Sequence, residues 1–124
     1  MQKLNSKFKT DLTQRTYKLS LSVIDLMNNL PQKRSAWVIA DQLLRASTSI
    51  GANIVEAKSS SSRLEFKKFY EISLKSANET IYWFNLLKDS KLANEKEVQS
   101  LIQETDEISR MLASSVMKLK NIKF

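Results

Sequence analysis

The stretch RASTSIGANIVEA, residues 45–57, contains the only glycine of the chain, at a position where the surrounding pattern predicts the middle of a helix. A glycine inside a helix costs about 1 kcal/mol relative to alanine. Apolar side chains recur around it every three or four residues, which gives the helix one apolar side. We therefore expect Gly51 to allow a neighbouring backbone to approach closely, or to permit a local bend, rather than to bind a ligand.

The side chains of the predicted helix 36–57 fall into three strips on a helical wheel. The apolar strip, which we expect to face the core, consists of Ile39, Leu43, Ala46, Ile50, Ile54 and Ala57. A separate polar strip consists of Gln42, Arg45, Ser49, Asn53 and Glu56. The third strip has small residues at its centre and consists of Leu44, Thr48, Gly51 and Val55. We expect another helix to approach along this third strip.

The composition is typical of a single all-α domain spanning residues 1–124. Hydrophobic residues make up 42% of the chain, and a single Gly and a single Pro leave few of the turns that a β-sheet needs. A chain of this length buries about two-thirds of its unfolded surface, which is enough for one core. One helical domain with one core is the prediction.

Several functional classes are disfavoured by what the chain lacks. It has no Cys and no His, which removes disulfides, thiolate metal sites, the commonest metal ligand and the commonest acid/base group. We therefore predict no catalytic residue, no metal and no cofactor. No apolar run reaches the roughly 18–20 residues of a membrane span, and the N-terminal MQKLNSKFKTDL lacks the apolar segment of a signal peptide. These features predict a cytoplasmic protein without membrane contact.

Helices are predicted over residues 11–30, 36–57, 63–88 and 95–121. Thr10 or Asp11 can cap the first helix, and Pro31 ends it because proline cannot continue the backbone hydrogen bonds. Ser35 is the expected cap of the second helix. The apolar strip of the first helix consists of Leu12, Leu19, Val23, Leu26 and Leu30, with Thr16 in step.

The third and fourth helices each begin with a capping-box pattern, Ser62 with Glu65 and Asn94 with Glu97. Short connections between long amphipathic helices require neighbours to run antiparallel. The predicted fold is therefore an antiparallel up-down-up-down four-helix bundle. A long coiled-coil hairpin is the main alternative, but separate start signals disfavour it because an uninterrupted coiled coil would not need them.

The predicted helix 63–88 has two apolar sides. Its core face consists of Phe66, Phe69, Tyr70, Ala77, Ile81, Phe84 and Leu87. A second apolar strip consists of Ile72, Trp83 and Leu86. A single bundle would leave this second strip exposed to water, so we expect it to be covered by another copy of the chain in a homo-oligomer.

Charged residues on the same helix allow two interpretations. Glu71, Lys75 and Glu79 recur every four residues, and the simpler interpretation is an ion-pair ladder on a solvated face. In the alternative, Glu79, beside Trp83, joins a polar network at a subunit seam. Its other members would then be Arg45, Asn53 and Glu56 of the second helix.

Two segments carry a family resemblance: QLLRASTSIGANIVEA and SSRLEFKKFYEISLKSANETIYWFNLLKDS. They resemble a bacterial four-helix-bundle family named for reading frames found in the intervening sequences of 23S ribosomal RNA genes. The resemblance covers about residues 8–120. Many relatives have proline at position 51 and glycine at position 75, so this chain resembles the branch with SIGAN and ETIYW. The positions that carry the resemblance are Gln42, Arg45, Ser49, Ile50, Ala52, Asn53, Glu56, Ala57, Ser62, Phe66, Lys75, Glu79, Thr80, Tyr82, Trp83, Leu86 and Leu87.

The resemblance implies an antiparallel four-helix bundle that assembles as a homopentamer. It implies no established activity. A distant relative is the accessory protein of diversity-generating retroelements, a basic pentameric barrel that associates with reverse transcriptase and nucleic acid. The ribosomal RNA in the family name describes where some of the genes lie, and fold alone does not determine function.

The first functional hypothesis is a non-enzymatic oligomer that binds RNA, DNA or a nucleoprotein through a basic surface. The formal charge is +7, from 20 Lys and Arg against 13 Asp and Glu. In an up-down bundle both termini and the second loop lie at one end, so basic residues near them share a surface. Lys and Arg are equally ordinary on a solvated face. The candidate contacts are Lys3, Lys7, Lys9, Lys58, Arg63, Lys67, Lys68, Lys118, Lys120 and Lys123.

Two other functional classes are open. A structural or protein-binding adaptor would dock a helix of a partner protein on its outer apolar strip and would not bind nucleic acid. An enzyme is disfavoured, because bundle di-iron sites use histidine and a phosphate-binding loop needs several glycines. A Glu56–Glu79 carboxylate pair could do acid/base work, but no nucleophile or substrate pocket accompanies it.

Overall fold

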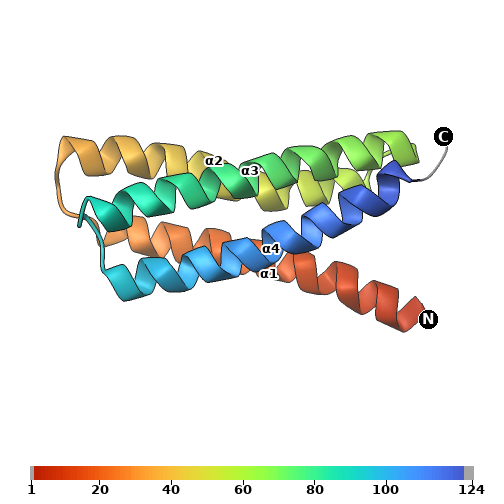
Figure 1. Ribbon diagram of the computed structural model, residues 1–124, viewed down its shortest axis with the longest axis horizontal. Helices are drawn as coiled ribbons and strands as arrows, with labels where there is room; N and C mark the ends of the chain where they lie inside the picture. Colours follow the sequence, from red (N-terminus) through yellow and green to blue (C-terminus); the bar gives the residue numbers. More distant parts are fainter. Residues whose placement is uncertain (1, 122–124) are drawn as a thin grey trace.

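The computed structural model describes the backbone of residues 2–121 and the side chains of residues 12–121. This part of the chain forms four long helices without a strand: α1 (Gln2–Asn28), α2 (Arg34–Lys58), α3 (Arg63–Asp89) and α4 (Glu95–Lys120). Consecutive helices run in opposite directions and pack side by side (Figure 1). The predicted all-α, antiparallel up-down-up-down bundle is confirmed.

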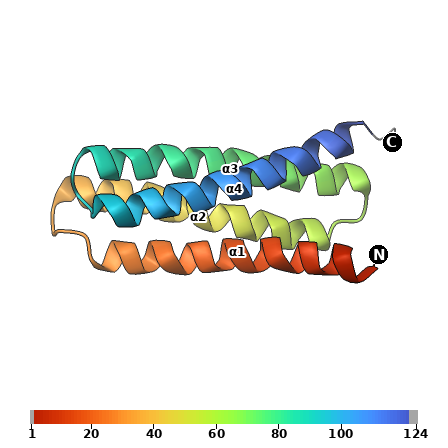
Figure 2. The same ribbon diagram turned by 60° about the horizontal axis from the view of Figure 1, so that its bottom comes forward.

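The four helices are not packed with equal closeness. Packing is most extensive between α2 and α3 and between α3 and α4, whereas α1 rests mainly on α2 and meets α4 over a short length. Figure 1 shows the beginning of α1 diverging from α4. Both ends of the chain and the α2–α3 loop lie at the same end of the bundle, as Figure 2 also shows. The expectation that these three segments share one end is confirmed.

The core is formed by the strips that the sequence pattern indicates. Leu12, Leu19, Val23 and Leu26 of α1 are at most 2% exposed, and Thr16 is fully buried among them. Of the six expected core residues of α2, Ile39 is half-buried and the others are buried. Phe84 is the largest fully buried side chain among residues 12–121. Burial of a leucine, isoleucine or phenylalanine side chain contributes about 1.5–3 kcal/mol, so these strips dominate the stability of the bundle.

The first two helices begin earlier than expected. Helix α1 begins at Gln2, so Thr10 and Asp11 lie within it and do not cap it. Helix α2 begins at Arg34, because Lys33 adopts an extended conformation and its carbonyl already accepts a hydrogen bond from the N–H of Trp37 at 3.1 Å. Ser35 therefore lies in the first turn, and the prediction that it caps α2 is wrong. Pro31 follows α1 closely, as expected, but α1 already ends at Asn28.

Side-chain caps define the starts of α3 and α4. The Ser62 hydroxyl accepts a hydrogen bond from the N–H of Glu65 at 3.1 Å, and Asn94 Oδ1 accepts one from the N–H of Glu97 at 3.0 Å. In a capping box the Glu65 carboxylate would accept a hydrogen bond from the N–H of Ser62. Here it accepts from the N–H of Ser61, one residue earlier. Both predicted starts are correct, and each cap contributes about 1 kcal/mol.

The turn that follows α3 contains a residue with left-handed backbone geometry. Lys91 has a φ of 61°. Its N–H donates to the carbonyl of Lys88, and the N–H of Leu92 donates to the carbonyl of Leu87, each at 3.1 Å. These two bonds satisfy carbonyl groups that the helix end would otherwise leave without partners, in the arrangement known as a Schellman motif. The chain is thereby turned into the short connection that places α4 antiparallel to α3.

Gly51 lies where Thr16 of α1 packs directly against the backbone of α2. A Cβ atom added to this glycine would lie 3.0 Å from Thr16 Oγ1 and 3.3 Å from Thr16 Cβ, tighter than ordinary van der Waals contact. The glycine therefore allows α1 to pack against α2, as one of the two sequence-based expectations proposed. Thr16 Oγ1 donates to the carbonyl of Thr13 at 3.0 Å, which holds the hydroxyl in this position.

We predict that Gly51→Ala destabilises the fold by up to about 2 kcal/mol, because overpacking costs about 1–3 kcal/mol and the gain in helix propensity is about 1 kcal/mol. Chemical denaturation of Gly51→Ala, Thr16→Ala and the double variant forms a double-mutant cycle. In the Thr16→Ala background, Gly51→Ala should be neutral or stabilising. Additive effects of the two substitutions would contradict the proposed contact.

Candidate interaction surfaces

A polar network joins α2 to α3 at the surface. Arg45 Nη2 donates to Glu79 Oε2 and, at 2.9 Å, to Gln42 Oε1. The same Glu79 oxygen accepts from the indole N–H of Trp83 at 2.9 Å. The predicted association of Arg45, Glu79 and Trp83 is therefore present within one chain. Because Arg45 and Glu79 are 60% and 37% exposed, this pair by itself contributes little to stability.

A second group of hydrogen bonds continues along the same seam. Asn53 Nδ2 donates to the carbonyl of Ser49 at 2.8 Å and to its hydroxyl at 3.0 Å. Ser76 Oγ donates to the Ser49 hydroxyl at 2.9 Å, and Ser73 Oγ donates to the carbonyl of Ile50 at 2.8 Å. The seam between α2 and α3 is thus held by small polar side chains as well as by apolar packing.

Glu56, a predicted member of the network, and Lys75, a predicted member of the ladder, do not form the expected contacts. Among the described side chains, Glu56 and Lys75 take no part in the hydrogen bonds of this seam, and Lys75 forms no ion pair with Glu71 or Glu79. The predicted ladder of Glu71, Lys75 and Glu79 is therefore wrong. The physical reason is that the Glu79 carboxylate binds two other groups instead of Lys75. These are Arg45 of α2 and the indole N–H of Trp83, one turn along α3.

The network changes the acidity of Glu79. The hydrogen bond from Trp83 is the largest effect and lowers the pKa of this carboxyl group below its ordinary value; burial opposes it, and the hydrogen bond and charge of Arg45 lower the pKa further. Both partners stabilise the charged form of the carboxylate. Glu79 is consequently an anion at neutral pH, fixed between two helices.

The outer face of α3 carries exposed apolar side chains. Ile72 and Leu86 are 45% and 36% exposed, as expected. Trp83 differs from the expectation, because its ring is half-buried against the core and its N–H is engaged by Glu79. Tyr82 lies on the outer strip in place of Trp83 and is 57% exposed. The two rings meet edge to face, with their centroids 5.0 Å apart.

A second apolar face, on α1 and α2, was missed by the sequence interpretation. Tyr17, Leu21 and Ile24 of α1 are 67%, 51% and 42% exposed, and Val55 of α2 is 53% exposed. Between the two helices lies a groove whose lining includes Gly51, Tyr17 and Val55. The signal was present, since Tyr17, Leu21 and Ile24 are spaced four and three residues apart beside the core strip.

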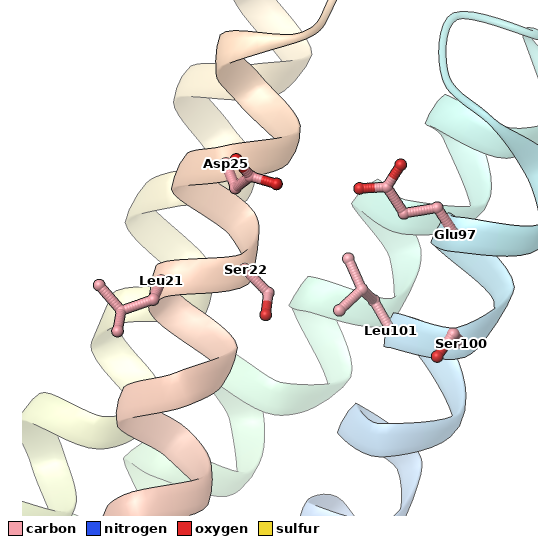
Figure 3. Close-up of a pocket in the computed structure, with 6 residues that line it drawn as sticks. All are labelled: Leu21, Ser22, Asp25, Glu97, Ser100 and Leu101. Atoms are coloured by element: carbon pink, nitrogen blue, oxygen red, sulfur yellow. The ribbon is translucent and has the colours of Figure 1, made fainter.

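A cleft between α1 and α4 lies near the opposite end of the bundle from the termini. Its lining residues are Leu21, Ser22, Asp25, Glu97, Ser100 and Leu101. Figure 3 shows the carboxylates of Asp25 and Glu97 pointing toward each other from the two helices, with Leu101 directed into the gap. Like charges facing each other do not attract, which is consistent with the short packing contact between α1 and α4.

Nearer the middle of the bundle, ion pairs join α1 to α4. Arg15 of α1 forms two hydrogen bonds to the Glu104 carboxylate, at 2.7 and 2.9 Å, and a third to Glu107 at 3.1 Å. The hydrogen bond to Glu104 raises the pKa of Arg15, against the opposing effect of burial. Paired, two-point contacts of this kind fix the position of both side chains. Arg15 thereby sets how far α1 can separate from α4.

The basic residues predicted for nucleic-acid binding gather at the end of the bundle that holds both termini and the α2–α3 loop. Lys58, Arg63, Lys68, Lys118 and Lys120 are exposed there, and Lys67 is half-buried. The side chains of Lys3, Lys7 and Lys9, and the whole of Lys123, lie outside the described residues. The backbone places residues 3, 7 and 9 in the first turns of α1, at this same end.

Charge is divided unevenly along the bundle. Among the described side chains, the half nearest the α2–α3 loop (residues 12–15, 50–75 and 108–121) carries nine Lys and Arg against three Glu. The remaining half (residues 16–49 and 76–107) carries seven Lys and Arg against nine Asp and Glu. The excess of positive charge is therefore confined to one end, which we call the basic end.

Other kinds of site find little support in the described part of the molecule. Within it, acidic side chains do not gather in any group of three or more that could hold a metal ion. None of its helices combines the length and apolar character needed to cross a membrane. The surfaces that remain are the basic end, the apolar faces on either side of α2 and the α1–α4 cleft.

Known proteins match both the sequence and the fold. The model of the 23S rRNA-intervening sequence protein family matches residues 9–114. A crystal structure of a protein of unknown function from the S23 ribosomal protein family of Bacteroides thetaiotaomicron is 31% identical, with a TM-score of 0.82. The match covers 88% of this chain and 97% of that protein. No curated protein sequence matches the chain.

The chain is a four-helix bundle, and both the family model and the solved relative match it over most of its length. The chain belongs to the 23S rRNA-intervening sequence protein family. The resemblance read from the SIGAN and ETIYW segments is confirmed at the level of the family. The family's description refers to the intervening sequence of 23S rRNA. The solved relative is a protein of unknown function. An activity therefore has to be argued from the surfaces of the molecule.

The contact between Trp83 and Glu79 predicts a pH-dependent stability. Trp83→Phe removes the indole donor and should cost about 1 kcal/mol at neutral pH. Because the folded pKa of Glu79 lies below its ordinary value of 4.5, the contribution is complete above that value and is lost as the pH falls through the folded pKa. The difference in unfolding free energy between Trp83→Phe and the parent should therefore shrink on acidification below about pH 4.

Trp37→Phe is the matched control for this measurement, because Trp37 is 58% exposed at the start of α2, away from Glu79. Its effect on the unfolding free energy should not change with pH in the same interval. Chemical denaturation followed by circular dichroism at neutral and acidic pH measures both variants. An equal loss of stability for Trp83→Phe at both pH values would show that the hydrogen bond does not act on the charged carboxylate.

Proposed function

We propose that this protein is a non-enzymatic, self-associating helical bundle that binds RNA or DNA through its basic end. The observation that carries the proposal is the separation of charge along the bundle, with nine basic against three acidic side chains in one half and seven against nine in the other. A net charge spread evenly over the surface would favour solubility alone. A charge concentrated on one end creates a local positive potential that attracts a polyanion.

Self-association strengthens such a surface. The exposed apolar side chains beside α2, among them Tyr17, Val55 and Tyr82, support contact with further copies of the chain. Each copy in an assembly contributes its own basic end, and a long nucleic acid can contact several of them at once. Linked weak contacts then act at a high effective concentration, which raises the total affinity without any new kind of contact.

The proposed binding does not depend on the base sequence. The basic end is formed by helix ends and a serine-rich loop, and its described side chains include Lys58, Arg63 and Lys68, which contact phosphates as point charges or forks. The neighbouring aromatic residues Phe66, Phe69 and Tyr70 pack in or against the core, so they form no exposed platform on which bases could stack. Binding to phosphates alone is governed by release of counterions, so its affinity falls steeply with salt.

The test compares two pairs of charge reversals. Lys118→Glu with Lys120→Glu alters the basic end, whereas Lys33→Glu with Lys96→Glu alters exposed lysines at the other end by the same net charge. The first pair should weaken binding of a short RNA or DNA roughly tenfold at low salt and reduce the slope of log affinity against log salt by about 2. The second pair should leave both quantities close to those of the parent.

Purification without nuclease gives an independent measurement, because the absorbance ratio detects nucleic acid that remains bound and light scattering gives the mass of the assembly. An affinity that is indifferent to salt, or equal losses from the two variant pairs, would contradict binding through the basic end. Absence of any nucleic-acid binding by an intact assembly would instead support the adaptor function, in which the apolar faces dock a partner protein.

A further inference from the structure

The seam between α1 and α4 is the most open side of the bundle. Of the neighbouring helix pairs, these two pack together over the shortest length, and Arg15 supplies the ion pairs between them. Toward the end of α1 they leave a cleft of about 380 Å³. In the described part of the chain α2 does not pack against α4, so this cleft opens on a different side of the bundle from the α2–α3 face.

The cleft combines exposed apolar side chains with unpaired carboxylates. Leu21 is 51% exposed, and the half-buried Leu101 points into the gap (Figure 3). The carboxylates of Asp25 and Glu97 face each other across it. Both residues are exposed, and within the described residues neither carboxylate accepts a hydrogen bond or forms an ion pair. A chain with a net charge of +7 therefore leaves these two anions without a cation.

Asp25 stands at a position where a negative charge costs stability. It lies in the last turn of α1, which ends at Asn28 and has no basic residue in that turn. The carboxyl end of a helix is the negative end of its dipole, and Glu97 across the cleft adds repulsion. Glu97 itself has a local role, because an acidic residue in the first turn of α4 stabilises that helix. An uncompensated cost such as that of Asp25 is typical of a functional position.

The lining of the cleft matches an arginine side chain. The aliphatic stem of an arginine can cover Leu21 and Leu101 while its charged head reaches the carboxylates. A guanidinium group has N–H donors on several sides and can bind two carboxylates at once. A calcium ion fits less well, because it takes about six to eight oxygen ligands and the leucines supply none. Nucleic acid is repelled by the two negative charges.

We propose that the α1–α4 cleft binds a segment of a partner protein that presents an arginine between apolar side chains. The guanidinium lies between Asp25 and Glu97, and the neighbouring apolar groups contact Leu21 and Leu101. Charge complementarity identifies this occupant, since the half of the bundle that holds the cleft carries seven basic against nine acidic side chains.

This inference goes beyond the proposed function, because it adds a second kind of partner at a separate place. The cleft lies toward the opposite end of the bundle from the basic end. A nucleic acid and a basic protein segment can therefore be bound at the same time. The bundle then joins a protein to a nucleic acid that carries the same sign of charge as the cleft. Because the charges of the cleft are exposed, we expect the contact with the protein to be weak and sensitive to salt.

The probe for the test is a short labelled peptide in which arginines and leucines recur three and four residues apart, so that they share one side of a helix. Fluorescence anisotropy at low salt measures its affinity for the parent protein. A peptide with glutamine in place of arginine should bind about tenfold more weakly, because two charge contacts are lost. A peptide with serine in place of leucine should also bind more weakly, because the apolar contacts are lost.

Asp25→Arg places the proposed occupant on the protein itself. The new side chain faces Glu97 and should pair with it, so we expect the affinity for the arginine peptide to fall about tenfold or more. The free energy of unfolding should not decrease, because attraction replaces repulsion and a cation suits the end of α1. Asp89→Arg is the matched control. It makes the same change of charge at an exposed residue in the last turn of α3, and should leave the peptide affinity close to that of the parent.

The other outcomes would overturn the proposal. These are no binding of the arginine peptide by the folded parent, or equal losses from Asp25→Arg and Asp89→Arg. Stabilisation of the parent by magnesium chloride alone, lost in Asp25→Arg, would assign the carboxylates to a metal ion instead. A lower mass of the assembly for Asp25→Arg than for Asp89→Arg would place a second copy of the chain in the cleft.

The two proposals can fail independently. Nucleic-acid affinity is measured on the same two variants, and Asp25→Arg should bind a short RNA or DNA as Asp89→Arg does, because both add the same charge outside the basic end. A parent that binds the peptide but no nucleic acid would contradict the proposed function and leave the cleft proposal in place. A parent that binds nucleic acid but not the peptide would do the reverse.

Discussion

Thr16 and Gly51 bring α1 and α2 so close that even one additional carbon atom on Gly51 would press against Thr16 at 3.0 Å. This approach decides where α1 lies, because α1 has only a short contact with α4. It allows Leu12, Leu19 and Val23 to be buried fully. The Arg15 ion pairs with Glu104 and Glu107 then fix the remaining distance between α1 and α4. The groove above Gly51 is a consequence of the same small residues.

Helix α2 has a special position because it packs against both α1 and α3 and yet has no charge near its middle. Hydroxyl and amide groups on its surface are hydrogen-bonded to backbone and to Ser76 rather than left for water. The charged residues of the chain lie outside this stretch, along α1, α3 and α4 and toward both ends of α2. In the proposed function, exposed apolar side chains join the copies while the basic ends stay free for a polyanion.

The sequence predicted the helical strips and the starts of α3 and α4, because local hydrogen bonds and periodic burial determine them. The start of α2 was harder to predict: the Ser35 side chain can cap a helix, but the extended backbone at Lys33 places the start two residues earlier. Trp83 was placed on the outer strip by its angle on the wheel. Its large ring nevertheless reaches back to the core and to Glu79, which a wheel cannot represent.

The amino-acid sequence by itself determined that this protein is an antiparallel bundle of four helices, that it belongs to its family, and that it has no histidine or cysteine for catalysis. These properties follow from periodicity, caps and composition, which are local. Only the tertiary structure decided that Glu79 binds Arg45 and Trp83 instead of Lys75, and that Tyr17 and Val55 border a groove. Such choices depend on which residues of different helices come into contact, and helix packing alone sets those distances.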